Sequence, residues 1–292
     1  MVKKVFANIY IYLILFLMYL PILVLIAFAF STNDTIAIGE AFNPGFDLFV
    51  SLFSGNKVSI QIWTAVGNTL IIALISAVVS VVLGTLGAIG VFYSKRRSQK
   101  VVEVATQIPV VNAEIVIALS LTVMFVFLGT YIFRTKLFSF WTLLIGHVVL
   151  SLPFVYLSVK PKLQQMDPNL YEAALDLGAK PSQGLFKVTI PQIMPGIFAG
   201  FLLSITLSLD DYIVTEFTRG PGLLSGDAAI ETLSTFIQAS LKKHTVPAEL
   251  RPLTLFIFLG VLAIVIAIVL IRNYKEKNKN RRGFARHEKT SF

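Results

Sequence analysis

Six blocks of about 20 mostly apolar residues dominate this 292-residue chain. A helix of that length crosses the hydrocarbon core of a bilayer and satisfies its own backbone hydrogen bonds there. With 55% hydrophobic and 14% charged residues, the chain is too apolar for a soluble domain of this size. We therefore predict an all-α integral membrane protein with six transmembrane helices. The expected spans are residues 9–30, 64–93, 104–129, 138–159, 193–215 and 252–272.

The first apolar block has a second interpretation as a signal peptide. Lys3 and Lys4 precede it, and Ala27-Phe28-Ala29 is similar to a cleavage site. Because the block is longer than a typical signal core, we expect a retained helix, followed by a polar loop over residues 31–60. The predicted parts of the chain are a first span with its outer loop, a core of five spans and a basic tail: residues 1–63, 64–272 and 273–292. Such a tail can contact anionic lipid.

The distribution of positive charge predicts the orientation in the membrane. If the N-terminus is cytoplasmic, 18 of the 25 lysines and arginines lie in cytoplasmic segments. Six spans then place both termini in the cytoplasm, together with the segment between the fourth and fifth spans. The net charge of +9 therefore reflects contact with the cell membrane and its lipids rather than with nucleic acid.

Several kinds of chemistry are missing from the sequence. There is no cysteine, and the three histidines are widely spaced, so we expect no metal site. No phosphate-binding loop and no hydrolase motif occurs, so we expect no catalytic residue and no cofactor in this chain. Any ATP-driven activity would need an ATPase in trans.

A short, punctuated helix is expected between the fourth and fifth spans, at residues 166–178. Asp167 is a suitable N-cap, Pro168 suits the first helical position, and Gly178 can end the helix in the left-handed conformation. Its apolar residues share one face: Leu170, Ala173, Ala174 and Leu177. Because a helix this short is marginal alone, it must dock on something, either the lipid headgroups or a groove in a partner protein.

The same stretch resembles the EAA motif of permease subunits of binding-protein-dependent ABC importers. The matching residues are Glu172-Ala173-Ala174, Gly178 and Val188-Thr189-Ile190-Pro191, with Val and Ile in place of the usual Ile and Leu. Asn68-Thr69-Leu70 in the second span is similar to the start of the family's core. The resemblance implies a type I importer permease fold with a cytoplasmic coupling helix. It also implies an ATPase subunit that binds ATP and Mg²⁺, a second permease and an extracellular substrate-binding protein. The residues it assigns to ATPase coupling are Tyr171, Glu172, Ala173, Ala174, Asp176, Gly178 and Pro191.

Acidic residues inside the membrane are costly and are therefore candidates for function. Asp210 and Asp211 lie near the outer end of the fifth span, and Glu216 follows them. Glu114 is expected a few turns into the third span. We predict that these acids and Tyr212 line a substrate path. The alternatives are that Asp210 or Asp211 caps a helix or pairs with Arg219, and that Glu114 makes one inter-subunit hydrogen bond.

Two further segments resemble the permeases of spermidine/putrescine importers in particular. They are Ser208–Val214 with Gly220-Pro221, and Leu152-Pro153-Phe154 after His147. Polyamines carry several ammonium groups, which carboxylates and aromatic rings would accommodate. We therefore predict a polyamine importer subunit. His147 is expected to make a helix–helix hydrogen bond rather than to relay protons.

Three alternative functions remain open from the sequence. They are a permease for another solute, a membrane enzyme that uses Asp210 and Asp211 as acids, and an ion-coupled secondary transporter. Two packing features are also expected. A seam of small residues in the second span favours close helix packing: Ser76, Ser80, Gly84 and Ala88. An amphipathic helix lies in the outer stretch between residues 217 and 250 and carries Ile230, Leu233, Phe236, Ile237 and Leu241.

Overall fold

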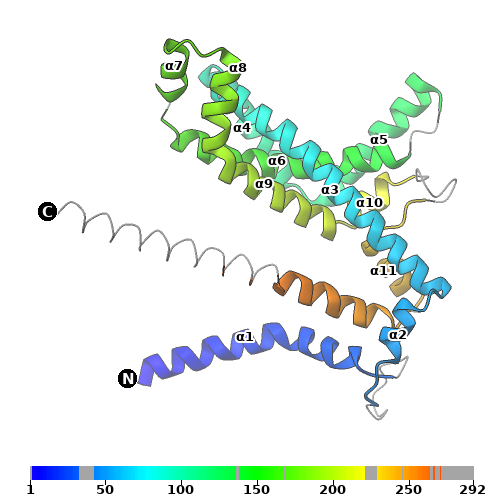
Figure 1. Ribbon diagram of the computed structural model, residues 1–292. Helices are drawn as coiled ribbons and strands as arrows, with labels where there is room; N and C mark the ends of the chain where they lie inside the picture. Colours follow the sequence, from blue (N-terminus) through cyan, green and yellow to red (C-terminus); the bar gives the residue numbers. More distant parts are fainter. Residues whose placement is uncertain are drawn as a thin grey trace. The chain divides into compact units, whose positions relative to one another are not determined.

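The computed structural model describes residues 2–32, 43–135, 138–167, 169–220, 229–244, 246–263, 266 and 270 (Figure 1). Within these residues the regular structure is helical, apart from an isolated bridge between Ser31 and Pro44. The chain divides into two compact units, Met1–Gln61 with Thr245–Phe292, and Ile62–His244. The division falls inside helix α3. The three parts predicted from the sequence remain a prediction.

The first unit contains α1 (Val2–Ala29), α2 (Asp47–Phe53) and a helix over Leu250–Ala263. The prediction of an unbroken loop over 31–60 is wrong, because α2 forms within it and α3 begins at Lys57. Leu48 and Leu52 of α2 are buried, which stabilises this short helix. The Ser51 hydroxyl donates to the Glu249 carboxylate over 2.8 Å, just before the last helix.

The second unit contains the remaining helices. In chain order they are α3 (Lys57–Phe92), α4 (Arg96–Val111), α5 (Glu114–Phe127), the π-helix η1 (Leu128–Phe133), α6 (Phe140–Gln165), α7 (Asn169–Asp176), α8 (Pro181–Gly184), the π-helix η2 (Leu185–Thr189), α9 (Ile190–Asp210), α10 (Ile213–Thr218) and α11 (Leu233–Lys242). The outer amphipathic helix predicted between residues 217 and 250 is α11. It begins with Thr232, whose hydroxyl accepts from the Thr235 N–H.

In the part of the chain that the structure describes, five helices are long and apolar enough to cross a membrane: Asn8–Ala29, Lys57–Phe92, Glu114–Phe133, Phe140–Gln165 and Pro181–Asp210. They correspond to the first five predicted spans. Of the sixth, the structure describes the helix Leu250–Ala263, which is shorter than a full span. The rest of the predicted 252–272 span lies largely outside the described residues, as does the 273–292 tail. The count of six spans therefore remains a prediction.

The third span begins later than predicted. The backbone is extended at Asn112 and Ala113, with ψ of 146° and 137°, so residues 104–129 do not form one helix. Pro109 lies in the last turn of α4 and cannot donate a backbone hydrogen bond there. Glu114 is consequently in the first turn of α5, and its side chain is exposed. The expectation that it lies several turns inside the span is wrong.

The fifth span ends earlier than predicted. Helix α9 stops at Asp210, and Asp211 is extended with ψ of 125°, so residues 193–215 are not continuous. The next helix, α10, begins at Ile213. The adjacent acids therefore lie at a break between two helices, on either side of the point where the backbone changes direction.

Helices α3, α6 and α9 pack closely through small residues. The predicted seam on α3 is confirmed, since Ser76, Ser80, Gly84 and Ala88 are all buried. Helix α9 has a second seam with the same spacing, at Gly196, Gly200, Ser204 and Ser208. Both seams face α6: a Cβ on Gly84 would lie 2.7 Å from Val155 Cγ1, and one on Gly200 would lie 3.1 Å from Val155 Cα. Small residues thus let three backbones approach each other.

This packing predicts that replacing two glycines of α3 with valine affects stability differently. Gly84→Val adds carbons where Val155 already lies, and overpacking of this kind costs about 1–3 kcal/mol. Gly87→Val is the matched control, because nothing lies within 4 Å of a Cβ built there. We expect the first variant to lower the unfolding temperature of the detergent-solubilised protein and the second to leave it nearly unchanged. Equal stability of the two variants would contradict the packing of α3 on α6.

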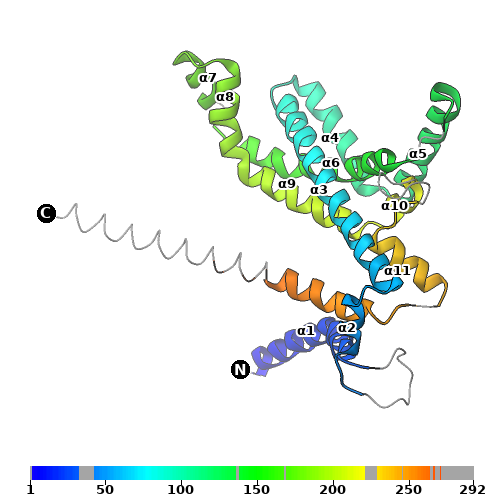
Figure 2. The ribbon, with the colours of Figure 1, turned by 45° about the vertical axis from the view of Figure 1, so that its right-hand side comes forward.

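Two regions lie at opposite ends of the paired α6 and α9. Both views show α7 and α8 at one end of this pair and α10 at the other (Figures 1 and 2). Helix α9 has 21 residues and therefore spans about 31 Å, close to the thickness of a hydrocarbon core. The expected docking helix and the expected acidic path are thus separated by about one membrane thickness.

Candidate functional site

Helix α7 has the ends predicted from the sequence. The Asp167 carboxylate accepts from the Asn169 N–H over 3.0 Å, while Pro168 lies outside the described residues. Gly178 has φ of +86°, a conformation that β-branched residues avoid. The Gly178 N–H donates to Leu175 O over 2.8 Å, and the Ala179 N–H donates to Ala174 O over 3.0 Å. These two bonds form a Schellman motif, which fixes where the helix ends.

One side of α7 packs on the chain itself. The Tyr171 ring contacts Gly184, where a Cβ would lie 2.9 Å from Tyr171 Cε2, and Leu175 lies beside it. The Tyr171 ring also lies 5.5 Å from the ring of Tyr93. Of the residues predicted to couple to an ATPase, Tyr171 therefore holds α7 in place. Ala174 is half-buried on the same side.

The other side of α7 is open. Glu172, Ala173 and Asp176 are exposed, and Leu177 has 90% of its surface accessible. No residue of α7 is buried. Pro191, the last residue of the predicted motif, is exposed in the first turn of α9. This short helix thus combines a fixed end with an uncovered face that carries both apolar and acidic side chains.

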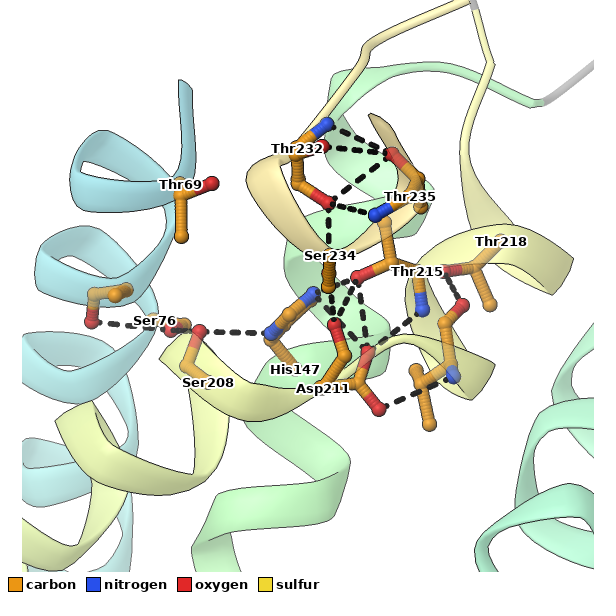
Figure 3. A network of polar contacts seen from close by, with 12 residues as sticks. Thr69, Ser76, His147, Ser208, Asp211, Thr215, Thr218, Thr232, Ser234 and Thr235 are labelled. Atoms are coloured by element: carbon orange, nitrogen blue, oxygen red, sulfur yellow. Dashed lines mark hydrogen bonds and ion pairs between the residues drawn. The ribbon is translucent and has the colours of Figure 1, made fainter. Parts of the chain in front are cut away.

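At the opposite end of α9, the Asp211 carboxylate caps α10 (Figure 3). Its oxygens accept from the Val214 N–H over 3.1 Å, the Thr215 N–H over 2.8 Å and the Thr215 hydroxyl over 2.9 Å. Its backbone carbonyl accepts from the Ser234 hydroxyl of α11 over 2.7 Å. Asp211 has 5% of its surface exposed, so this acid holds the chain together at the break. Helix capping was the alternative role considered from the sequence.

His147 of α6 lies beside this cap and bridges it to α9. Its Nε2 is 3.0 Å from Thr215 Oγ1 and 3.7 Å from Asp211 Oδ2. Its Nδ1 is 2.7 Å from the hydroxyl of Ser208, which also contacts Ser76 on α3. The helix–helix hydrogen bonds expected for His147 are therefore present. Sequence reasoning missed Ser208 and Thr215, although Thr215 follows Asp211 by one helical turn.

Asp210 differs from its neighbour, because its side chain is exposed. Glu114 is also exposed, and it interacts electrostatically with both Asp210 and Asp211. The structure therefore brings together three of the predicted path residues from α5 and from the end of α9. Among the described residues, no group of three or more metal-ligating side chains could hold a metal ion.

The two other predicted path residues already have partners within the chain. The Glu216 carboxylate pairs with Arg219 over 2.8 Å, so Arg219 pairs with Glu216 rather than with either aspartate. Lys242 Nζ of α11 donates to the Tyr212 hydroxyl over 3.3 Å and lies 5.9 Å from the centre of its ring. Tyr212 is thus shown to accommodate a primary ammonium group.

Comparison with known proteins identifies this architecture. A family model described as "Binding-protein-dependent transport system inner membrane component" matches residues 80–277, more than half of the chain. The chain belongs to this family. It is therefore a permease subunit of an ABC transporter and a multi-pass membrane protein, not an enzyme. The alternative of a membrane enzyme that uses Asp210 and Asp211 as acids is excluded.

Named relatives of the permease are transport subunits as well. It is 33% identical over 227 residues to the spermidine/putrescine transport system permease protein PotC of Escherichia coli K12, covering 78% of this chain and 80% of PotC. It is 35% identical over 160 residues to the putrescine transport system permease protein PotI of the same strain, covering 54% of this chain and 57% of PotI. A PotC homolog of Mycoplasma genitalium is 27% identical over 212 residues, covering 73% of this chain and 70% of the homolog.

The fold of the permease also matches a solved transporter. In the crystal structure of a bacterial ABC transporter involved in the import of the acidic polysaccharide alginate, one chain superposes with a TM-score of 0.62 at 20% identity. The match covers 90% of the permease and 92% of that chain. At this identity the likeness concerns the fold alone. It supports the predicted type I importer architecture.

Proposed function

We propose that this permease moves polyamines such as spermidine and putrescine into the cell by alternating access. It would act with a separate ATPase that binds ATP and Mg²⁺, with a second permease and with an extracellular substrate-binding protein. The named functions of PotC and PotI support the substrate class. The family supports the ATP-driven assembly.

The observation that carries this proposal is a pair of exposed acids, Asp210 at the end of α9 and Glu114 at the start of α5. Asp210 and Glu114 are both accessible and close enough to interact electrostatically. Uncompensated carboxylates near a membrane favour a cationic ligand, because two like charges repel when nothing lies between them. A flexible polyamine carries ammonium groups that can contact both carboxylates in turn.

Tyr212 adds a second favourable feature. Its ring and hydroxyl contact the Lys242 ammonium group, which has the same chemistry as each end of a polyamine. The two carboxylates would repel an anionic solute, and a neutral solute could hydrogen-bond to these three side chains but would form no ion pair. The local chemistry therefore favours a polycation over other solutes of ABC importers.

The orientation that fits this function places α7 and both termini in the cytoplasm. Positive charge concentrates on that side, as the sequence predicts. The uncovered face of α7 would then insert into a groove of the ATPase, with Glu172, Ala173, Asp176 and Leu177 at the contact. Closure of two ATPase copies around ATP would bring the coupling helices of the two permeases together. Asp210 at the opposite end of α9, about one membrane thickness from α7, would face the substrate-binding protein.

A deletion strain tests the proposed function. Cells that lack this permease should lose most ATP-dependent uptake of labelled spermidine or putrescine, and uptake should return with a plasmid copy. Uptake of a labelled amino acid in the same strain is the control. Unchanged polyamine uptake in a strain without other polyamine importers would contradict the proposal.

A further inference from the structure

His147 is a buried polar residue in the third turn of α6. It has 1% of its surface exposed, and its ring contacts side chains of two other helices, α9 and α10. Nδ1 meets the Ser208 hydroxyl of α9 at 2.7 Å, and Nε2 meets the Thr215 hydroxyl of α10 at 3.0 Å (Figure 3). A buried imidazole has two ring nitrogens, and here each of them has a partner on a different helix.

The partners of His147 determine the direction of the hydrogen bonds. Thr215 has one hydroxyl proton, which it donates to Asp211 Oδ2 over 2.9 Å. Thr215 Oγ1 must therefore accept from His147 Nε2–H, which leaves Nδ1 to accept from the Ser208 hydroxyl. The Ser76 hydroxyl lies 3.3 Å from Ser208 Oγ and 3.2 Å from Ala73 O, so its single proton is shared between these two acceptors. The result is a chain of donors that runs from Ser208 of α9 through His147 of α6 and Thr215 of α10 to the carboxylate of Asp211.

This chain ends at the residue that creates the helix break. With its oxygens held by Thr215 and Val214, Asp211 starts α10 and stops α9 at Asp210. The exposed acid Asp210 is therefore the last helical residue because its neighbour is a fixed cap. A carboxylate bound by three donors has little freedom, and its backbone moves with it.

We infer that His147 is a positioning residue for the substrate path: acting through the Thr215 hydroxyl, it fixes the Asp211 cap and thereby the orientation in which Asp210 is presented. His147 itself does not touch the substrate. The inference rests on the proposed function for its significance, while the geometry can be tested without any polyamine.

Two pairs of variants separate positioning from packing. Thr215→Val keeps the shape of the side chain and removes the hydroxyl, whereas Thr215→Ser keeps the hydroxyl and removes a methyl group. His147→Leu removes both ring nitrogens, whereas His147→Gln retains an amide N–H that can donate to Thr215. A positioning role predicts that Thr215→Val and His147→Leu impair the presentation of Asp210. It also predicts that Thr215→Ser and His147→Gln largely preserve it. A packing role predicts the opposite order at Thr215, because valine packs as threonine does.

The first readout is the accessibility of position 210. Because the chain has no cysteine, Asp210→Cys provides a single thiol in an assembled, detergent-solubilised transporter whose other subunits lack reactive cysteines. We measure its rate of modification by a small cationic methanethiosulfonate. Because position 210 is already exposed, a changed orientation should change this rate in either direction by about fivefold in Thr215→Val, the factor that corresponds to one lost hydrogen bond. Ser98→Cys, exposed at the start of α4, is the control and should react at an unchanged rate.

The second readout is polyamine uptake in chains that retain Asp210. His147→Leu and Thr215→Val should raise KM by about fivefold or more with a smaller change in the maximal rate. Equal rates of thiol modification at position 210 in all backgrounds would overturn the inference, as would a Thr215→Ser variant that is more impaired than Thr215→Val.

The two readouts also separate the positioning role from the proposed function. If the wild-type transporter does not move polyamines, the proposed function fails, while the rates of thiol modification at position 210 still decide the positioning role. If an apolar variant does not assemble, Ser208→Ala, which removes only the donor to Nδ1, replaces it and should shift the rate in the same direction.

Discussion

Replacing Gly178 with valine should lower transport by at least about tenfold while leaving the permease in the membrane. Gly178 has φ of +86°, and a β-branched residue in this conformation costs at least about 1–2 kcal/mol. The Schellman bonds that end α7 would break, and Leu177 and Asp176 would move away from their present positions. A cost of about 1.4 kcal/mol lowers the population of correctly formed helix about tenfold, and uptake by the reconstituted importer should fall at least as much.

The matched control is Gly178→Asn, because asparagine tolerates the left-handed conformation. Nothing lies within 4 Å of a Cβ at this position, so steric overlap does not complicate the comparison. We expect the asparagine variant to retain most uptake and to co-purify with the ATPase, and the valine variant to do neither. Glu172→Lys should also weaken co-purification, since it reverses the charge of the exposed face. Normal transport by Gly178→Val at normal subunit abundance would show that α7 does not couple to the ATPase.

Neutralising Asp210 should impair polyamine transport much more than it impairs assembly. A carboxylate that meets a desolvated ammonium group makes a charge-assisted hydrogen bond of about 1.5–3 kcal/mol, whereas an amide makes a weaker, neutral one. If passage at this site limits the rate, Asp210→Asn should lower uptake by about 10- to 150-fold. Because the Asp210 side chain is exposed rather than packed into the core, the subunits should still co-elute on size exclusion.

Two further variants distinguish a charge requirement from a helix cap. Asp210→Glu keeps the charge and should retain much of the uptake. Asp211→Asn should behave differently from Asp210→Asn, because it weakens a buried cap and so lowers the yield of assembled complex as well as transport. Labelled spermidine uptake in proteoliposomes, normalised to assembled complex, provides the comparison. Near-normal uptake by Asp210→Asn would leave the acid with no part in the substrate path.

The ends of α7 could be predicted from the sequence because each depends on one residue. Asp167 and Gly178 have strong local preferences for a cap and a left-handed terminator, and the structure contains both. The small residues on α3 were equally informative, since a spacing of four residues defines one face of a helix. The helix ends and the small-residue face of α3 depend on residues close together in the sequence, so they could be predicted without knowing the tertiary structure.

The breaks at Asn112–Ala113 and at Asp211 could not be predicted in this way. Both lie inside long apolar runs that read as continuous spans, and hydropathy does not respond to one extended residue. The cap at Asp211 depends on Thr215, but its stability also depends on His147, which lies 64 positions earlier in the chain than Asp211. Only the packing of α6 against α9 and α10 reveals that these residues act together.

The most direct measurement of the central claim is ATP-dependent solute uptake by the purified, complete transporter in proteoliposomes. The permease is reconstituted with its ATPase, its second permease and its binding protein, and labelled spermidine, putrescine, an amino acid and a neutral sugar are compared. We predict ATP-dependent accumulation of at least one polyamine, competition by the other, and no uptake without the ATPase. Accumulation of the amino acid or the sugar with no polyamine uptake would contradict the account.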